Sequence, residues 1–518
     1  MIRYLAAGAA IVAALTATIA DARWLRAETE SFIIYSEGSD KSLRDFASKL
    51  QRFDVALRLL LNVKEQGEPN RLPIYLLAST GDVAKLHSGS RDASVVGFYR
   101  TARDGSFAVS HRDNGGSTRG TSPSQETLFH EYAHHFMKRY RTGAFPAWII
   151  EGFAEYYSTV DFDKNGKALI GKPAYGRGYG LVQLPQIPVA ALITTDPQSL
   201  KTVGQVDVYY GRAWLLIHML FHDPARDGQL GTYIRAINMG VEPTQAARTA
   251  FGDIAKLDKD LTVYLKRPLS YRMTNDPIPV PAQITVSVLP PAEDALIPLR
   301  LARMNGPARD DDAKAIRDSL RTLAATHADS ASAWFEYAAA EWGLDEDVRN
   351  LPAVRSALDR ALAIKPDHVR ANVLLGEWMM HDLDEKDDFE DASWVRARAP
   401  VELAIKTDPN DPLPLYVYYQ SFSEQREMAP TAAIDGLEKA FRLSPENIQF
   451  RVAYALALAN RGQFGSAIQL AQSIAFDPHM GAQARPLLNQ LLRLRAESTG
   501  LREEAIEAED EVGNGTGE

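Results

Sequence analysis

Cysteine does not occur anywhere in the 518 residues of the chain. Its absence excludes disulfide bonds, zinc–thiolate sites and thiol nucleophiles, so any metal must be held by histidine and carboxylate side chains. An excess of positive charge is also missing. The chain has 57 basic and 67 acidic residues and a net charge of −10. This balance argues against a nucleic-acid partner, because a general nucleic-acid binder would normally have a basic face.

Long apolar runs are missing as well, except at the start of the chain. Within residues 1–22, Arg3 gives a positive charge, Leu5 to Ala20 is almost wholly apolar, and Ala20-Asp21-Ala22 resembles a cleavage site. This pattern is typical of a secretory signal peptide. We expect a periplasmic or secreted protein whose mature chain, from Arg23, has no membrane span. A retained membrane anchor is the alternative, because the run is only slightly too short to cross a bilayer.

Length and composition favour a soluble protein with more than one domain. A chain of 518 residues is too long for one ordinary core, so two or three domains are expected. The contents of 45% hydrophobic and 24% charged residues are those of a globular protein.

The region 23–267 is predicted to be an α+β domain with a small mixed sheet and active-site helices. Its strand-like runs are Ser31–Ser36, Leu72–Leu77, Val95–Tyr99 and Ser106–Ser110. Between the first two runs, Leu43 to Val63 has apolar residues at the three-and-four spacing of an amphipathic helix. From about Ser122 to Lys266 the pattern is helical. Residues 268–292 are crowded with proline and are predicted to be a linker, within which Ile284 to Leu289 alternates like a strand.

The region 293–496 is predicted to be an all-α domain of consecutive helix pairs. Leu358–Pro366, Glu402–Pro409 and Leu437–Pro445 are similar segments, and their closing prolines lie 43 and 36 residues apart. Such periods, with a proline closing the second helix, resemble tetratricopeptide repeats. The resemblance implies a surface for protein partners. Residues 497–518 are rich in glutamate and glycine and are predicted to be an acidic, disordered tail.

A helix with two histidines one turn apart is the most informative part of the sequence. Ser122 as N-cap, Pro123 as first helical residue and Gln125 three residues after the cap predict where this helix begins. His130 and His134 then project from one face, where two imidazole nitrogens can bind one zinc ion. Glu131 lies beside that face, within reach of a metal-bound water.

A second helix supplies a carboxylate. Glu151 and Glu155 are four residues apart in an otherwise apolar and aromatic helix that begins after Pro146. Two histidines and Glu151 would leave the fourth position of zinc open, as a catalytic site requires. Glu155 is placed to accept a hydrogen bond from the free ring nitrogen of a ligand histidine.

These residues carry a family resemblance. His130-Glu131-Tyr132-Ala133-His134 followed by Trp148-Ile149-Ile150-Glu151-Gly152-Phe153-Ala154-Glu155 is similar to the gluzincin branch of zinc peptidases. The resemblance implies a zincin-like fold and one Zn²⁺ per chain held by His130, His134 and Glu151, with Glu131 as general base. It also implies a tyrosine that stabilises the oxyanion, for which Tyr210 is the first candidate and Tyr209 the second.

One departure from the gluzincin aminopeptidases is clear. Their Gly-x-Met-Glu-Asn motif, which grips the free amine of the substrate, does not occur upstream of His130. We therefore expect an endopeptidase or a specialised processing enzyme, with the strand Ser106–Ser110 pairing with an extended substrate by analogy with other zincins. His218 and His222 are also four residues apart, but no glutamate follows the first of them, so a packing or surface role is expected.

The sequence therefore predicts an exported zinc metallopeptidase that acts on a peptide or protein substrate. One alternative is a catalytically inert periplasmic scaffold that binds peptides or protein partners through its repeats. Another is a hydrolase with the same metal chemistry that acts on a non-peptide amide or ester.

Overall fold

The computed structural model describes residues 23–65, 67–91, 95–112, 121–141, 143–280, 284–307, 309–477 and 484–498. The expected signal peptide, residues 1–22, and residues 499–518 of the expected tail, 497–518, lie outside the described residues. Residues 484–498 are helical. Among the described residues, no helix combines the length and the apolar character that crossing a membrane requires.

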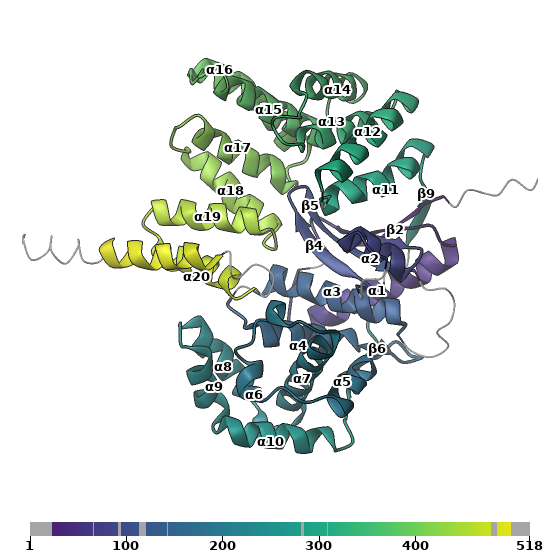
Figure 1. Cartoon of the computed structure of the whole chain (residues 1–518), viewed down its shortest axis with the longest axis vertical. Helices are drawn as coiled ribbons and strands as arrows, with labels where there is room; N and C mark the ends of the chain where they lie inside the picture. The colour runs from purple at the N-terminus through teal and green to yellow at the C-terminus, as the bar shows by residue number, and fades with distance from the viewer. Residues whose placement is uncertain are drawn as a thin grey trace, which may run out of the picture.

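A six-stranded mixed sheet lies at the centre of the molecule (Figure 1). Its strands, in spatial order, are β4 (Phe98–Ala102), β5 (Gly105–His111), β3 (Leu72–Leu77), β2 (Phe32–Ser36), β1 (Leu25–Glu28) and β9 (Thr285–Val288). β3 runs parallel to β2 and β5, and the other pairs are antiparallel. Strand β9 comes from the proline-rich segment, so part of the segment predicted as a linker completes the sheet.

The two faces of the sheet are covered by different helices because side chains along a strand alternate. On β3, Ile74 and Leu76 belong to the core formed with α1 (Asp40–Leu60) and α3 (Pro123–Tyr140). Tyr75 belongs instead to a core that includes residues of α2 (Thr80–Ser88) and α11 (Pro291–Asn305). The first core is the one that continues into the candidate site.

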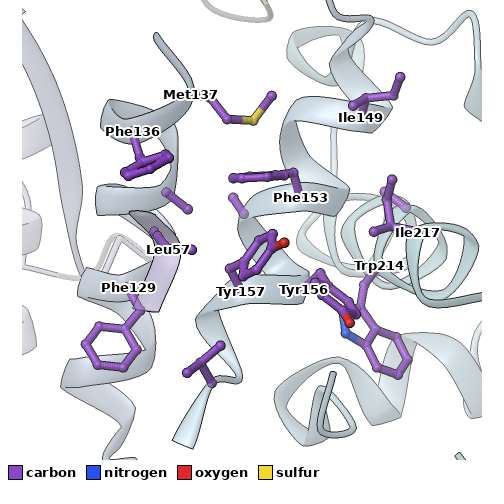
Figure 2. Packing of buried hydrophobic residues seen from close by; sticks show 14 of the residues in the cluster. Leu57, Phe129, Phe136, Met137, Ile149, Phe153, Tyr156, Tyr157, Trp214 and Ile217 are labelled. Carbon is purple, nitrogen blue, oxygen red and sulfur yellow. The ribbon is translucent and has the colours of Figure 1, made fainter. Parts of the chain in front are cut away.

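Below the sheet, as Figure 1 is drawn, lies a group of helices with a small second sheet. The helices are α4 (Ala147–Ser158), α5 (Gly178–Gln183), α6 (Val189–Leu192), α7 (Val203–His222), α8 (Gln229–Asn238), α9 (Pro243–Phe251) and α10 (Ile254–Leu265). The sheet contains β6 (Asp161–Phe162), β7 (Ala168–Ile170) and β8 (Arg272–Met273). Helix α4 packs against both α3 and α7. Figure 2 shows the apolar side chains of these three helices, among them Phe136, Phe153 and Trp214.

The C-terminal half forms the predicted succession of helix pairs. After α11 and α12 (Asp310–Thr326), the pairs are α13 (Ala331–Trp342) with α14 (Leu351–Ile364), α15 (Val369–Asp384) with α16 (Asp391–Thr407), α17 (Pro412–Glu424) with α18 (Thr431–Leu443), and α19 (Ile448–Asn460) with α20 (Phe464–Ala475). We call α11–α20 the helix array. The closing prolines Pro366, Pro409 and Pro445 each follow the second helix of a pair. Figure 1 shows the array following an arc around one end of the sheet. The molecule is therefore of mixed α+β class with a C-terminal region of helical repeats.

Candidate metal centre

Helix α3 begins where the sequence predicts. The Ser122 side chain accepts a hydrogen bond from the backbone N–H of Gln125, and the Gln125 side chain accepts one from the backbone N–H of Ser122. This reciprocal cap satisfies two backbone donors that the first turn would otherwise leave without partners, and Pro123 occupies the first helical position. The helix phase that follows places His130 and His134 on one face.

The two histidines face each other through their Nε2 atoms. Their Nε2 atoms are 3.0 Å apart, and the rings lie nearly perpendicular at 85°. His134 is buried, whereas the side chain of His130 stays 13% exposed and lines a cavity. The pair therefore directs two nitrogen donors at one point, beside a cavity that His130 lines.

Helix α4 brings a carboxylate to the same point. Oε2 of Glu151 lies 3.6 Å from Nε2 of His130 and 3.4 Å from Nε2 of His134. Glu151 is fully buried, a costly position for a carboxylate without a counter-charge. Its neighbour Gly152 lets α4 approach α7 closely, because a Cβ there would lie 2.7 Å from the backbone oxygen of Ala213.

The three residues fit a zinc ion in chemistry and in spacing. One donor atom from each of His130, His134 and Glu151 lies within 4.8 Å of the others, and no other such group of three or more occurs among the described residues. Two histidines and one glutamate are a ligand set of catalytic zinc. Ligands at about 2.1 Å in a tetrahedral arrangement would be roughly 3.4 Å from one another. The observed separations of 3.0, 3.4 and 3.6 Å bracket that spacing.

Behind His130 lies a chain of charged side chains. Oε1 of Glu155 is 3.2 Å from Nδ1 of His130. Arg177 donates two hydrogen bonds to the Glu155 carboxylate, at 2.6 and 3.1 Å, and one to Asp207 at 3.3 Å. The structure thus places Glu155 at the ring nitrogen of His130 that does not face Glu151.

The electrostatics of the site favour positive charge at the histidine nitrogens. Burial would lower the pKa of His130, but the carboxylates of Glu151 and Glu155 raise it to about 10. Burial would raise the pKa of Glu155, yet Arg177 and His130 lower it to about 2. Burial likewise opposes ionisation of Glu151, and the two histidines hold its pKa well below the usual value. Carboxylates that hold a proton on His130 would also attract a divalent cation.

A cavity of about 660 Å³ opens onto these residues. Its lining includes His130, Glu131 and Glu155 from α3 and α4, together with Arg177, Asp207 and Tyr210. Glu131 is half-buried. Val95, Val96 and Gly97, which lead into β4, also line the cavity.

The two tyrosines at the start of α7 point in different directions. The Tyr210 ring stacks on that of His130, with ring centroids 6.0 Å apart, and the Arg177 guanidinium lies 5.1 Å from its centroid. Tyr209 is fully buried, and its hydroxyl donates to the backbone oxygen of Thr195 at 3.4 Å. Of the two candidates from the sequence, Tyr210 is the one at the cavity.

His218 and His222 lie elsewhere on α7 and pack against aromatic rings. Their imidazoles stack 4.1 Å apart. His218 is buried, and its Nδ1 lies 2.8 Å from the hydroxyl of Tyr264. His222 Nε2 lies 2.9 Å from the hydroxyl of Tyr156. This pair has the surroundings of packed side chains.

The prediction that Ser106–Ser110 pairs with an extended substrate is wrong. These residues belong to β5, which is hydrogen-bonded to β3 on one side and to β4 on the other. A strand with a partner on each side is not an edge to which an extended peptide could add. The edge of the sheet next to β5 is β4, which overlaps the predicted strand Val95–Tyr99 at Phe98 and Tyr99.

Sequence reasoning did not find Arg177 and Asp207. Arg177 lies in a short 3₁₀ turn, Tyr175–Arg177, in a glycine-rich stretch without helical or strand periodicity. Asp207 is in the second turn of α7, where one acidic residue has no distinguishing spacing. A single arginine outside any motif gives no indication in the sequence that it binds a glutamate 22 residues away.

Comparison with known proteins gives a distant likeness to a solved structure. No protein-family model and no curated protein matches the chain. Among solved structures, the crystal structure of yeast Tom70 matches, with 14% sequence identity and a TM-score of 0.28. The match covers 73% of this chain and 72% of that one. A likeness at this level carries no argument about fold or function.

Proposed function

We propose that this chain is an exported zinc metallopeptidase of the gluzincin type, with a zincin-like domain in residues 23–267. One Zn²⁺ per chain would be held by His130, His134 and Glu151. The observation that supports this proposal best is the convergence of three such donors, from two helices, beside a cavity that His130 lines. Glu131, Glu155 and Tyr210 line the same cavity and are groups of the kind that hydrolysis requires.

Each of these side chains has a role that its position supports. Zinc at this site would lower the pKa of a bound water to about 7 and polarise a peptide carbonyl. Glu131 would take the proton of the attacking water and pass it to the leaving amine. Tyr210 would donate a hydrogen bond to the developing oxyanion. Its phenol stays protonated, because burial and the carboxylates of Glu151 and Glu131 raise its pKa above the usual value.

A second candidate function is a scaffold that binds protein partners through the helix array. The observation that favours it is the array itself, since consecutive helix pairs stack into extended surfaces suited to binding peptides. In this case the metal centre would have no catalytic role. The third candidate, hydrolysis of a non-peptide amide or ester, uses the same metal site and differs only in substrate.

Metal content and turnover test the proposal. The chain from residue 23 onward is expected to contain close to one zinc, measured by plasma mass spectrometry after purification without chelator. His134→Ala should remove the metal, and His222→Ala, the control outside the site, should retain it. Glu131→Gln should retain zinc and lose cleavage of a peptide library. Folded wild-type protein without zinc, even after zinc is supplied, would overturn the proposal and favour the scaffold.

The peptide digest separates the first and third candidates. Zinc-dependent cleavage that disappears in Glu131→Gln supports a peptidase. If the wild-type protein holds zinc but leaves every peptide in the library intact, the choice moves to amide and ester substrates, because the metal chemistry alone does not select among these bonds.

A further inference from the structure

The turn of the β4–β5 hairpin lies against the helix array. The turn consists of Arg103 and Asp104, between Ala102 and Gly105, which are paired in the sheet. Figure 1 shows this end of the sheet reaching the arc of helices α11–α19. The first helices of the pairs face it: residues of α13, α15 and α17 line a cavity of about 230 Å³ together with the turn.

Charged groups of the array bind both residues of the turn. Arg103 forms an ion pair with Glu377 of α15. The Asp104 carboxylate forms one with Arg303 of α11, at 2.9 Å, and Arg370 of α15 donates to the backbone oxygen of Asp104 at 3.0 Å. Two helices far apart in sequence thus hold side chains and backbone of one two-residue turn.

Two further contacts flank the turn. The Asn447 side chain, which caps α19, donates to the backbone oxygen of Ala102 at 3.3 Å. The Ser106 hydroxyl donates to Glu446 at 3.3 Å. The contacts come from α11, α15 and the start of α19, so they span most of the array. These hydrogen bonds and ion pairs together fix the position and the direction of the hairpin.

The environment of Asp104 is arranged for a negative charge. Burial would raise the pKa of Asp104, but Arg303 and Arg370 outweigh it and lower the pKa below the usual value. Arg303 also donates to Glu336 of α13, at 2.7 Å. The array thus places two arginines, Arg303 and Arg370, around Asp104, whose negative charge they stabilise.

Strand β4 runs from the β4–β5 turn back to the candidate metal centre, which the residues before its first residue border. Val95, Val96 and Gly97 line the cavity together with His130. A Cβ on Gly97 would lie 2.4 Å from a methyl group of Thr127, so the strand passes tightly against α3 one turn before His130. The Tyr99 hydroxyl lies 3.1 Å from Nδ1 of His135 on α3. Within the sheet only one edge of β4 is paired.

We propose that the helix array is an internal clamp, which holds the β4–β5 turn and thereby positions the edge strand β4 at the rim of the metal cavity. Asp104 and Arg303 are positioning residues in this assignment. The consequence for catalysis rests on the proposed peptidase function, whereas the clamp itself does not. The clamp would also give the helix array a role within the chain, because the β4–β5 turn already contacts the first helices of the pairs.

Hydrogen–deuterium exchange tests the clamp without relying on activity. In the full chain, Asp104→Ala should speed exchange across residues 95–102 by about tenfold or more, since the strand loses the anchor that opposes local opening. The control is Asp359→Asn, which removes an exposed carboxylate of α14 from a pair with Arg355 and should leave this segment unchanged. Faster exchange confined to residues 103–105 would overturn the proposal.

A charge reversal provides a second test that does not depend on one variant folding well. Arg103→Glu and Glu377→Arg should each speed exchange across residues 95–102, and the double variant should recover most of the wild-type protection. Single and double variants that all exchange like the wild type would overturn the clamp. The clamp would also be overturned if the double variant lost as much protection from exchange as the single variants do. In a pair of residues that contact each other, the second substitution should restore part of the protection that the first removes.

Peptide kinetics then connect the clamp to the proposed function. With a peptide that the wild-type protein cleaves, Asp104→Ala should raise KM by roughly three- to tenfold while kcat and zinc content change by less than about twofold, because a displaced rim affects substrate binding before chemistry. An unchanged KM beside increased exchange would show that β4 does not position the substrate. If no peptide is cleaved at all, the proposed function fails, and the exchange data still decide the clamp.

Discussion

Oε1 of Glu155 lies 3.2 Å from Nδ1 of His130, whereas Nε2 of the same ring faces Glu151. Each nitrogen of this imidazole therefore has its own carboxylate. A proton on Nδ1, held by Glu155, leaves the Nε2 lone pair available for a metal and fixes the orientation of the ring. Arg177 in turn holds the Glu155 carboxylate through two hydrogen bonds.

Removal of the Glu155 carboxylate should weaken zinc binding without abolishing it. Glu155→Ala is expected to reduce zinc affinity about 10- to 100-fold, the usual effect of losing the group that orients a ligand histidine. Competition with a chromophoric chelator measures this affinity. Glu126→Ala is the control, because Glu126 lines the same cavity but lies in the first turn of α3. Equal weakening in both variants would point to a general loss of negative charge rather than to orientation.

Tyr210 and Tyr209 form a matched pair for a test of oxyanion stabilisation. Tyr210→Phe should lower kcat by about 100-fold with little change in KM, because the phenol would act on charge that develops only in the transition state. Tyr209→Phe removes only a long hydrogen bond to the Thr195 backbone oxygen and should leave kcat within about twofold. Steady-state cleavage of one peptide by the three proteins decides the matter. Similar losses in both variants would remove Tyr210 from the proposed mechanism.

The parts of the site that the sequence predicts depend on local geometry. The cap at Ser122 sets the start of α3, and helical spacing then puts His130 and His134 on one face, so these features follow from a few neighbouring residues. The placement of Glu151 needs one further step, the packing of α4 on α3. The helix pairs are predictable for the same reason, since their apolar pattern and closing prolines recur along the chain.

The parts that the sequence does not predict depend on contacts between distant segments. Arg177 binds Asp207 thirty residues away, and Asp104 binds Arg303 far along the chain. Strand order has the same origin: β4 is the edge and β5 is internal because β3 pairs with β5. Periodicity shows which residues form a strand, but the neighbours of the strand are chosen by packing across the whole sheet.

Gly152 should tolerate no side chain. A Cβ would lie 2.7 Å from both the Ala213 backbone oxygen and the Ile217 side chain, so Gly152→Ala must push α4 away from α7. We expect a loss of about 1–3 kcal/mol in the free energy of unfolding, together with lower zinc content because Glu151 moves with α4. The control is Gly465→Ala on α20, where a Cβ meets nothing within 4 Å. Urea unfolding of both variants tests this, and an unchanged Gly152→Ala protein would contradict the close packing.

Glu68 should make the stability of the protein depend on pH. Its carboxylate accepts hydrogen bonds from Tyr140 at 2.7 Å and Arg58 at 3.0 Å and forms an ion pair with Arg139 at the end of α3. Burial raises its pKa from 4.5 to about 7, although Arg139, Tyr140 and Arg58 oppose the rise. The folded state therefore binds the proton more tightly than the unfolded chain does.

Because the folded state binds this proton more tightly, the contribution of Glu68 to the free energy of unfolding falls as the pH rises. The stabilisation from the protonated Glu68 is fully present below about pH 4.5 and is lost as the pH rises through about 7, by up to roughly 3 kcal/mol. Glu68→Gln cannot lose a proton, so between pH 5 and pH 8 its free energy of unfolding should rise relative to that of the wild-type protein. Urea unfolding at pH 5, 6, 7 and 8 measures the gap, with the exposed Glu385→Gln as control. Parallel curves for the wild type and Glu68→Gln would show that the folded state keeps Glu68 ionised throughout, with the two arginines outweighing burial.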